Sequence, residues 1–190
     1  GLGFHIPGRF DKVLDLNQCH LQDDISNKIR KFVKKFSLDH NYSFHDLKNK
    51  GGFLRNIIVR NSTLNEWMII MVFGENNEEE IKLFLDSLLK EFPIITSLFY
   101  TINTKLNDTI YDLELVNYYG NDFMLEQLGD LKFKIRPKSF FQTNSYQAFA
   151  LYQTALDFAD LQGTENVYDF YCGTGTITNF IAKKAKMAIG

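Results

Sequence analysis

Apolar residues that recur every three or four positions predict three helices in this chain. The first begins near Asp24, the second spans residues 78–92 ahead of Pro93, and the third runs from about Ser145 to Asp160. Short polar side chains just before such a pattern commonly accept hydrogen bonds from the first N–H groups of a helix. The predicted caps are Asp24 or Ser26, Asn76 or Asn77, and Asn144.

Runs of β-branched and aromatic residues predict strands between these helices. The predicted strands cover residues 13–16, 53–60, 66–73, 95–103, 109–119, 123–128 and 131–135. A hairpin across Lys105-Leu106-Asn107-Asp108 would join two of them. The order strand, strand, helix, strand, strand is typical of an α+β domain with a mainly antiparallel sheet.

The predicted elements change near Pro137 from mainly strands to a helix, a strand and a glycine turn, and we place a domain boundary there. Residues 1–137 form the predicted α+β domain, and residues 138–190 form the beginning of a second domain with helix, buried strand and glycine turn. The overall class predicted is therefore α/β. Only fifteen residues follow Gly175, so we expect this second fold to be completed by residues outside the chain.

The charge and the cysteine content limit the kinds of binding surface and of cellular compartment that fit this chain. The chain has 21 basic and 23 acidic residues, so a nucleic-acid surface would have to be a local patch. Five basic residues crowd the first helix, and both a solvated face and a phosphate-binding face remain open for them: Lys28, Arg30, Lys31, Lys34 and Lys35. The two cysteines lie far apart, which favours a reducing, cytoplasmic compartment, and no apolar run is long enough to span a membrane.

The most informative local pattern is Asp169-Phe170-Tyr171-Cys172-Gly173-Thr174-Gly175, which follows a predicted buried strand and precedes a helix. It lacks the third glycine of the dinucleotide fingerprint, and no Gly-Lys-Ser/Thr of a P-loop follows it. An acidic residue at a strand end followed by two close glycines is typical of sites for adenosine-containing cofactors. A purely structural strand-turn-helix remains the alternative.

A second motif, Ser139-Phe140-Phe141-Gln142-Thr143-Asn144, stands about 25 residues ahead of the glycine turn. Together the two motifs closely resemble those of the RNA uracil-5-methyltransferases, which make 5-methyluridine in ribosomal and transfer RNA. The resemblance extends over the chain through softer matches at Lys12-Val13-Leu14-Asp15, Leu54-Arg55 and Asn103-Thr104-Lys105. It implies that the second domain is the opening of a Rossmann-like methyltransferase domain that uses S-adenosylmethionine.

The resemblance also implies a cofactor site. Gln142 and Tyr171 occupy positions that contact S-adenosylmethionine in the family, while Asp169, Gly173 and Gly175 form the turn that approaches it. From the residues alone, a cap of the following helix is the favoured explanation for Gln142 and a core position the favoured one for Tyr171. With the resemblance, we predict the cofactor roles.

The catalytic residues of this family lie in later motifs that the chain does not contain. The resemblance implies a cysteine nucleophile that adds to uracil C6 so that C5 accepts the methyl group. Cys172 is not at that position, so we predict no catalytic residue in this chain and no activity for these 190 residues alone. Many members also bind a 4Fe-4S cluster, and the resemblance implies that Cys19 would be its fourth ligand in the intact protein. One thiolate alone cannot hold such a cluster.

RNA contacts are predicted at Arg55, Arg136 and Lys138, and stacking on a flipped base at Phe140, Phe141 or Tyr146, with core packing expected for at least two of these three aromatics. Two other functions remain open: an RNA-binding or assembly module with a vestigial methyltransferase part, and a methyltransferase with a substrate other than RNA. Whether the RNA is ribosomal or transfer RNA does not follow from the residues.

Overall fold

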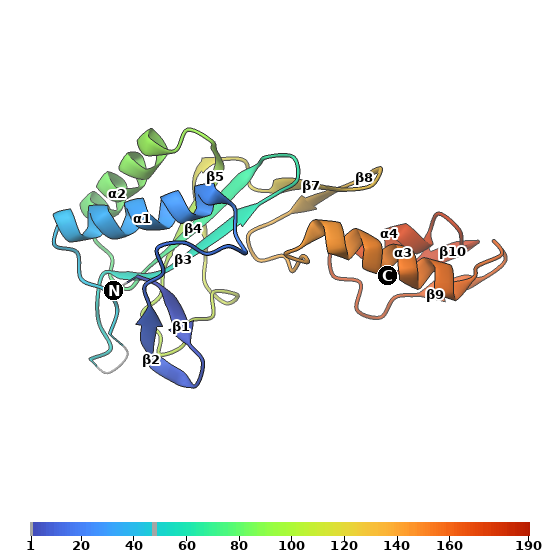
Figure 1. The fold of residues 1–190 in the computed structure, drawn as a ribbon, viewed down its shortest axis with the longest axis horizontal. Coiled ribbons are helices and arrows are strands. Elements are labelled where there is room, and N and C mark those ends of the chain that lie inside the picture. Colours follow the sequence, from blue (N-terminus) through green and yellow to red (C-terminus); the bar gives the residue numbers. More distant parts are fainter. Residues whose placement is uncertain (1, 47–48) are drawn as a thin grey trace. The chain divides into compact units, whose positions relative to one another are not determined.

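The computed structural model describes residues 2–46 and 49–190, which divide into two compact units. The first unit contains residues up to Arg60 together with Met68–Gly120, and the second contains Asn61–Trp67 and Asn121–Gly190. Figure 1 shows the order of the elements along the chain. Each unit is described separately below.

The first unit is an α+β structure built on a four-stranded sheet. Its elements are β1 (Phe4–Ile6), β2 (Arg9–Leu14), α1 (Asp24–Asp39), β3 (Leu54–Asn61), β4 (Trp67–Phe73), α2 (Glu78–Glu91), β5 (Ile95–Ile102) and β6 (Val116–Gly120). The sheet has the order β3-β4-β5-β6, while β1 and β2 form a separate antiparallel hairpin. The strands β5 and β6 are antiparallel, with Leu98 opposite Tyr119.

The relative directions of the strands in this sheet follow from backbone hydrogen bonds at the strand ends. Gly74 N–H donates to Phe53 O at 2.7 Å, which joins the end of β4 to the start of β3, so these two strands are antiparallel. Asn103 N–H donates to Phe73 O at 2.8 Å and joins the ends of β5 and β4, so these two run in the same direction. The expected mainly antiparallel sheet is confirmed, with one parallel pair where α2 makes the crossover.

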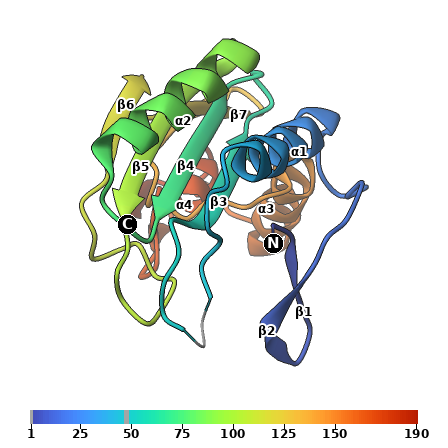
Figure 2. The same ribbon diagram turned by 90° about the vertical axis from the view of Figure 1, so that its left-hand side faces the viewer.

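The helices α1 and α2 lie side by side on one face of the sheet (Figure 2). Phe84 of α2 meets Phe73 of β4 edge to face, with ring centroids 5.9 Å apart, and Phe36 of α1 packs on Phe84 at 5.5 Å. Every residue of β4 is buried, so this strand forms the middle of the core. The apolar faces predicted for both helices are correct, because these faces pack in the core.

Three local predictions in this unit are wrong. The strand predicted over residues 13–16 is β2, which begins at Arg9 and ends at Leu14. The cap of α1 is Asp23, whose carboxylate accepts from Ile25 N–H at 2.8 Å, instead of Asp24 or Ser26. The predicted strand over residues 109–119 shrinks to β6, because residues 103–115 form a loop around a buried arginine and do not pair with a neighbouring strand. The predicted caps Asn77 and Asn144 are both confirmed.

The second unit contains β7 (Met124–Leu128), β8 (Leu131–Ile135), α3 (Ser145–Ala159), β9 (Asn166–Tyr168), α4 (Thr176–Ile181) and β10 (Met187–Ile189). The first two strands form an antiparallel hairpin that closes at Leu128 and Leu131. β9, α4 and β10 form a strand-helix-strand unit whose strands are parallel, the arrangement with which Rossmann-like sheets are built. The fold class predicted from the sequence is therefore confirmed.

The division between the units differs from the predicted boundary at Pro137. The β7–β8 hairpin precedes Pro137 but groups with the residues after it, because Phe133 packs on Phe141 and Glu126 binds Ser145. The tip of the β3–β4 turn also belongs to this unit, where Glu66 accepts a hydrogen bond from Leu125 N–H at 2.6 Å. The boundary at Pro137 stays a prediction about domains in the full-length protein.

Candidate functional site

The Phe-Phe-Gln segment lies between β8 and α3 and presents alternate side chains to the core and to solvent. Phe141 is buried, with its ring 5.9 Å from that of Phe133, whereas Phe140 is 72% exposed. Gln142 is also exposed, and it makes no hydrogen bond with the part of the chain that the structure describes. Buried Phe141 therefore fixes the segment while its neighbours face outward.

Asn144 settles which residue caps α3. Its side chain accepts from Gln147 N–H at 3.0 Å, as an N-cap does. Gln142 is therefore not the cap, and the structural explanation considered for it does not hold. Of the three aromatics considered for base stacking, only Phe141 is core, so the expectation that at least two would be core is wrong: Phe140 and Tyr146 are both exposed.

A buried carboxylate, Glu126, holds the beginning of α3 in place. This side chain is 2% exposed and accepts hydrogen bonds from Ser145 Oγ at 2.7 Å, Thr63 N–H at 3.0 Å, Gln127 N–H at 2.8 Å and the Thr63 hydroxyl. A buried charge is stable only when its oxygens are satisfied in this way. Sequence reasoning missed Glu126, although its inward position between Met124 and Leu128 on a strand is a readable signal.

A cavity of about 420 Å³ opens beside this carboxylate network, within the same unit. Its lining combines aliphatic, aromatic and polar side chains: Thr63, Leu64, Gln127, Ser145, Tyr146 and Phe149. Tyr146 is among the most exposed aromatics of the unit. The cavity was not predicted, because residues 63–64 and 145–149 are distant in sequence.

The glycine turn after β9 is closed by its own acidic residue. Asp169 accepts from Thr178 Oγ1 at 2.7 Å and from Tyr171 N–H at 3.1 Å, so one carboxylate ties the turn to α4. Its own N–H donates to Ile189 O at 2.7 Å, which continues the pairing of β9 with β10. Asp169 therefore shapes the turn, and Thr178, which sequence reasoning noted only as a missing glycine, is its partner.

Both glycines of the turn need the conformation that only glycine adopts easily. Gly173 has φ 54° and Gly175 has φ 74°, and Gly175 N–H donates to Cys172 O at 2.7 Å. Tyr171 is 97% exposed, so it packs in no core formed by the described residues. Cys172 is half-buried within the turn. At its two glycines, the turn thus presents backbone that carries no side chain, next to an exposed aromatic ring.

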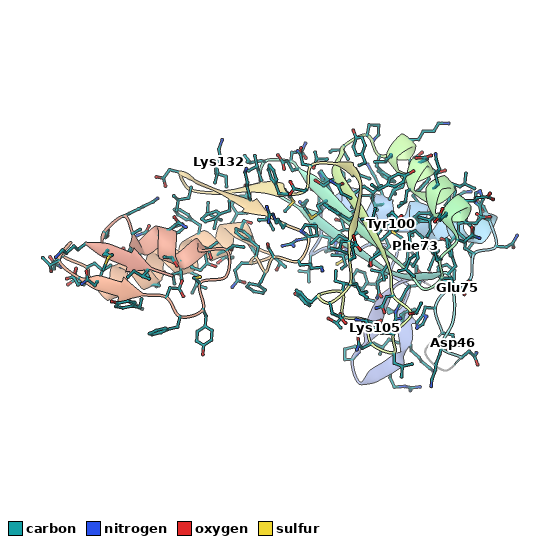
Figure 3. The ribbon with its side chains drawn as sticks, turned by 180° about the vertical axis from the view of Figure 1, so that it is seen from behind. Asp46, Phe73, Glu75, Tyr100, Lys105 and Lys132 are labelled. Atoms are coloured by element: carbon teal, nitrogen blue, oxygen red, sulfur yellow. The ribbon has the colours of Figure 1, made fainter. Side chains whose placement is uncertain are left out.

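The structure corrects the expectation for Arg55. Its side chain is only 1% exposed, and its guanidinium donates to the carbonyl oxygens of Asn103, Lys105 and Asn107 and to the carboxylate of Asp108. Figure 3 labels Lys105 in this loop. Because the donors are used inside the loop, Arg55 has no free group to offer a phosphate and serves as the anchor of residues 103–108.

The other two arginine and lysine candidates are closer to solvent. The side chain of Arg136 is 74% exposed and lies 3.9 Å from the carboxylate of Asp122, while Lys138 is half-buried after the turn that Ser139 N–H closes on Arg136 O. On α1, Arg30 is buried and donates to Leu16 O and Asn27 Oδ1, whereas Lys28 and Lys31 are exposed. The five basic residues of this helix therefore do not form one continuous face.

Cys19 is held by two hydrogen bonds to one side chain. Asn27 Oδ1 accepts from Cys19 N–H at 2.8 Å, and Asn27 Nδ2 donates to Cys19 O at 3.1 Å. Within the described residues, no group of three or more His, Cys, Asp or Glu side chains is placed to hold a metal ion. Among the same residues, none of the helices combines the length and apolarity that crossing a bilayer requires.

The fold and these two motifs together define an α/β protein in which an α+β unit leads into the beginning of a Rossmann-like methyltransferase domain. Two curated relatives, both named uncharacterized RNA methyltransferases, match the chain from end to end. The relative from Bacteroides thetaiotaomicron is 50% identical and the one from Porphyromonas gingivalis 47%, each over 192 aligned residues. The predicted resemblance to RNA methyltransferases is confirmed.

The chain spans less than half the length of these relatives, since the matches cover 100% of the chain but 42% and 41% of the two proteins. No protein-family model matches the chain. Among solved structures, it is similar to the tRNA (uracil-54, C5)-methyltransferase of Pyrococcus abyssi in complex with S-adenosyl-L-homocysteine. That match has a TM-score of 0.74 and 28% identity, and it covers 96% of this chain and 43% of the solved chain.

Proposed function

We propose that the full-length protein transfers a methyl group from S-adenosylmethionine to C5 of a uridine in RNA. The observation that carries the proposal is the match along 96% of the chain to a tRNA uracil-C5 methyltransferase. The RNA methyltransferase names of relatives at 50% and 47% identity support the same class of substrate. Ribosomal and transfer RNA both remain within the proposal.

The cofactor residues proposed are Gln142, Tyr171, Asp169, Gly173 and Gly175. The geometry of the second unit supports them, because Gln142 is exposed and makes no hydrogen bond within the described residues, and Tyr171 is almost fully exposed. The glycines at positive φ leave room for a ligand to approach the backbone, and Asp169 keeps the turn in shape. When bound, S-adenosylmethionine supplies an electrophilic methyl group on its sulfonium.

The nucleophile is proposed to be a cysteine outside residues 1–190, as the resemblance implies. Cys172 does not take that role in the proposal, since its carbonyl oxygen closes the glycine turn and its side chain is half-buried there. The contribution of this chain is then to bind the cofactor and to help place the RNA. Residues 1–190 alone are therefore expected to transfer no methyl group.

Arg136 and Lys138 are proposed to contact RNA near the Phe-Phe-Gln segment, with Phe140 and Tyr146 as exposed aromatic rings on which a base can stack. Cys19 is proposed as the fourth ligand of a 4Fe-4S cluster only if the other three thiolates come from residues outside this chain. The double hydrogen bond from Asn27 would hold the backbone of that ligand in a fixed position.

The test uses the full-length natural protein with tritium-labelled S-adenosylmethionine and RNA from cells that lack it. We expect label at C5 of one uridine after digestion and base mapping. Transfer to another base, to protein or to nothing would refute the proposal. An assembly module with a vestigial methyltransferase part would bind this RNA without any transfer.

The cofactor residues are tested separately by calorimetry with S-adenosyl-L-homocysteine. Gln142→Ala and Tyr171→Ala are each expected to weaken binding about tenfold, which corresponds to about 1.4 kcal/mol. Gln147→Ala is the matched control, because Gln147 is an exposed glutamine on α3. Equal affinities for all three variants and the natural protein would remove Gln142 and Tyr171 from the site.

A further inference from the structure

The outer face of the β7–β8 hairpin carries cations at every second position. Lys132, Lys134 and Arg136 are exposed, while the residues between them, Phe133 and Ile135, are buried. Lys132 and Lys134 share one face of β8, as alternate residues of a strand do, and Arg136 is the exposed residue directly after the strand; we call these three cations the basic stripe. Figure 3 shows the side chain of Lys132 extending away from the hairpin.

The neighbouring strand completes this face with uncharged side chains. In the register of the hairpin, Lys132 lies opposite Gln127 and Lys134 opposite Leu125, and the Lys134 ammonium sits 4.6 Å from the centre of the Phe123 ring. A cation over an aromatic ring is held in position without losing its charge. The hairpin therefore presents a row of cations beside a row of apolar and amide side chains.

Little acidic charge lies on this face to neutralise the stripe. Asp122 is 3.9 Å from Arg136, and the side chain of Lys132 makes no hydrogen bond or ion pair with the described residues. Asp130, in the turn of the hairpin, pairs with Lys183 instead. Since the whole chain has a net charge of −2, this accumulation of positive charge is local.

We propose that the basic stripe binds the phosphate backbone of the RNA substrate, an inference that rests on the proposed function and deepens it. Cations on alternate residues of a strand are about 6.7 Å apart, so the row follows an extended polyanion with closely spaced charges. Phe123, Leu125 and Gln127 lie along the same face and offer contacts to sugars and bases. An acidic protein would use the charges but would not use this flat aromatic and amide row.

The stripe also continues directly into the Phe-Phe-Gln segment. Arg136 follows the last residue of β8, and three residues separate it from Phe140. Backbone contacts position a nucleic acid and base contacts select the site, so a phosphate track at this place would guide the strand toward the exposed aromatics. The stripe thus assigns a role to Lys132 and Lys134 that the sequence did not suggest.

The experiment measures RNA affinity of the full-length protein at several salt concentrations, using fluorescein-labelled single-stranded RNA of mixed sequence and total transfer RNA. The test variant replaces the three stripe residues with glutamine, as Lys132→Gln, Lys134→Gln and Arg136→Gln. The matched control removes the same charge from the exposed side of α1, as Lys28→Gln, Lys31→Gln and Lys35→Gln. Thermal unfolding of both variants shows that each still folds.

We expect the stripe variant to lose at least tenfold in affinity at low salt. Its slope of log affinity against log salt should fall by about 2, because each single-strand phosphate contact contributes about 0.7. The α1 variant should keep most of the slope of the natural protein. Equal losses in the two variants, or a larger loss on α1, would overturn the inference.

Three further outcomes show whether the proposed function or only the stripe fails. If the natural protein binds neither RNA with a salt-dependent affinity, the proposed function fails and the stripe fails with it. If the natural protein methylates and binds RNA while the stripe variant behaves in the same way, only the stripe is refuted. Poly-glutamic acid is a polyanion that has no bases. If it loses affinity for the stripe variant to the same extent as RNA does, the face binds polyanions in general, and the inference of an RNA track is overturned.

Discussion

The two units differ in where they place their aromatic residues. In the first unit, Phe73 belongs to β4, whose every residue is buried, and meets Phe84 of α2 in the core. In the second, Phe170 and Tyr171 stand in solvent beside strands of three residues each, which are only partly covered. The first unit therefore buries its aromatics in its own core, whereas several aromatics of the second unit are not covered by any of the residues that the structure describes.

The motif residues of the second unit have only a small core to hold them, in which Phe141 packs on Phe133. Polar side chains supply the other fixed positions: Glu126 at the start of α3, and Asp169 inside the glycine turn. A small aromatic cluster adds to this, with Phe180 packing on Phe149 and Tyr152 at 5.6 and 5.5 Å. Within the second unit, these few polar contacts and one small aromatic cluster thus set the positions of the turn and of α3.

The largest expected effect is on the core of the first unit. Phe84→Ala should lower the free energy of unfolding by about 4 kcal/mol, because a fully buried ring leaves a cavity. Phe170→Ala, in the second unit, should change it by less than about 0.5 kcal/mol, since that ring is exposed. Urea unfolding followed by the fluorescence of Trp67, the single tryptophan, measures both. Comparable losses would break the comparison.

A smaller effect is expected at the polar support of the second unit. Glu126→Gln keeps the shape of the side chain but turns an NH₂ group toward N–H and O–H donors, which should cost about 2 kcal/mol. Chemical denaturation measures the loss, and Glu79→Gln on the exposed side of α2 is the control. An unchanged stability would show that the carboxylate is not needed to hold Thr63 and Ser145 together.

The smallest effect concerns His45 in the first unit. Burial lowers the pKa of this imidazole below its usual value of 6.5, and the positive charge of Arg55 lowers it further, against the opposing carboxylates of Asp108 and Asp46. Below pH about 6.5 the unfolded chain then binds more protons than the folded one, so stability falls as the pH falls.

The measurement for His45 is the urea midpoint between pH 8 and pH 5, which flank the ordinary histidine range by about 1.5 units on each side. His45→Gln should flatten the decline on the acidic side, whereas the exposed His20→Gln should leave it as it is. If both variants follow the natural protein, the acid sensitivity of the first unit has another source.

Sequence reasoning predicted the elements with a clear period and the motifs with a clear order. The three helices were found because their apolar faces repeat at helical spacing, and Asn77 and Asn144 were found because caps act within three residues. The strand predicted over residues 109–119 was largely wrong, because the chain before β6 is shaped by Arg55, about fifty residues earlier. Local signals therefore predicted local structure well and contacts across the chain poorly.

By itself, the sequence determined the fold class, the resemblance to RNA methyltransferases and the residues proposed for the cofactor, since all of these depend on patterns that lie within short stretches. Only the tertiary structure decided which charged residues are buried. Arg55 and Glu126 are ordinary surface types in the sequence, yet one anchors a loop and the other supports α3. The physical reason is that burial and hydrogen bonding are properties of neighbours in space, which residues far apart in the chain supply.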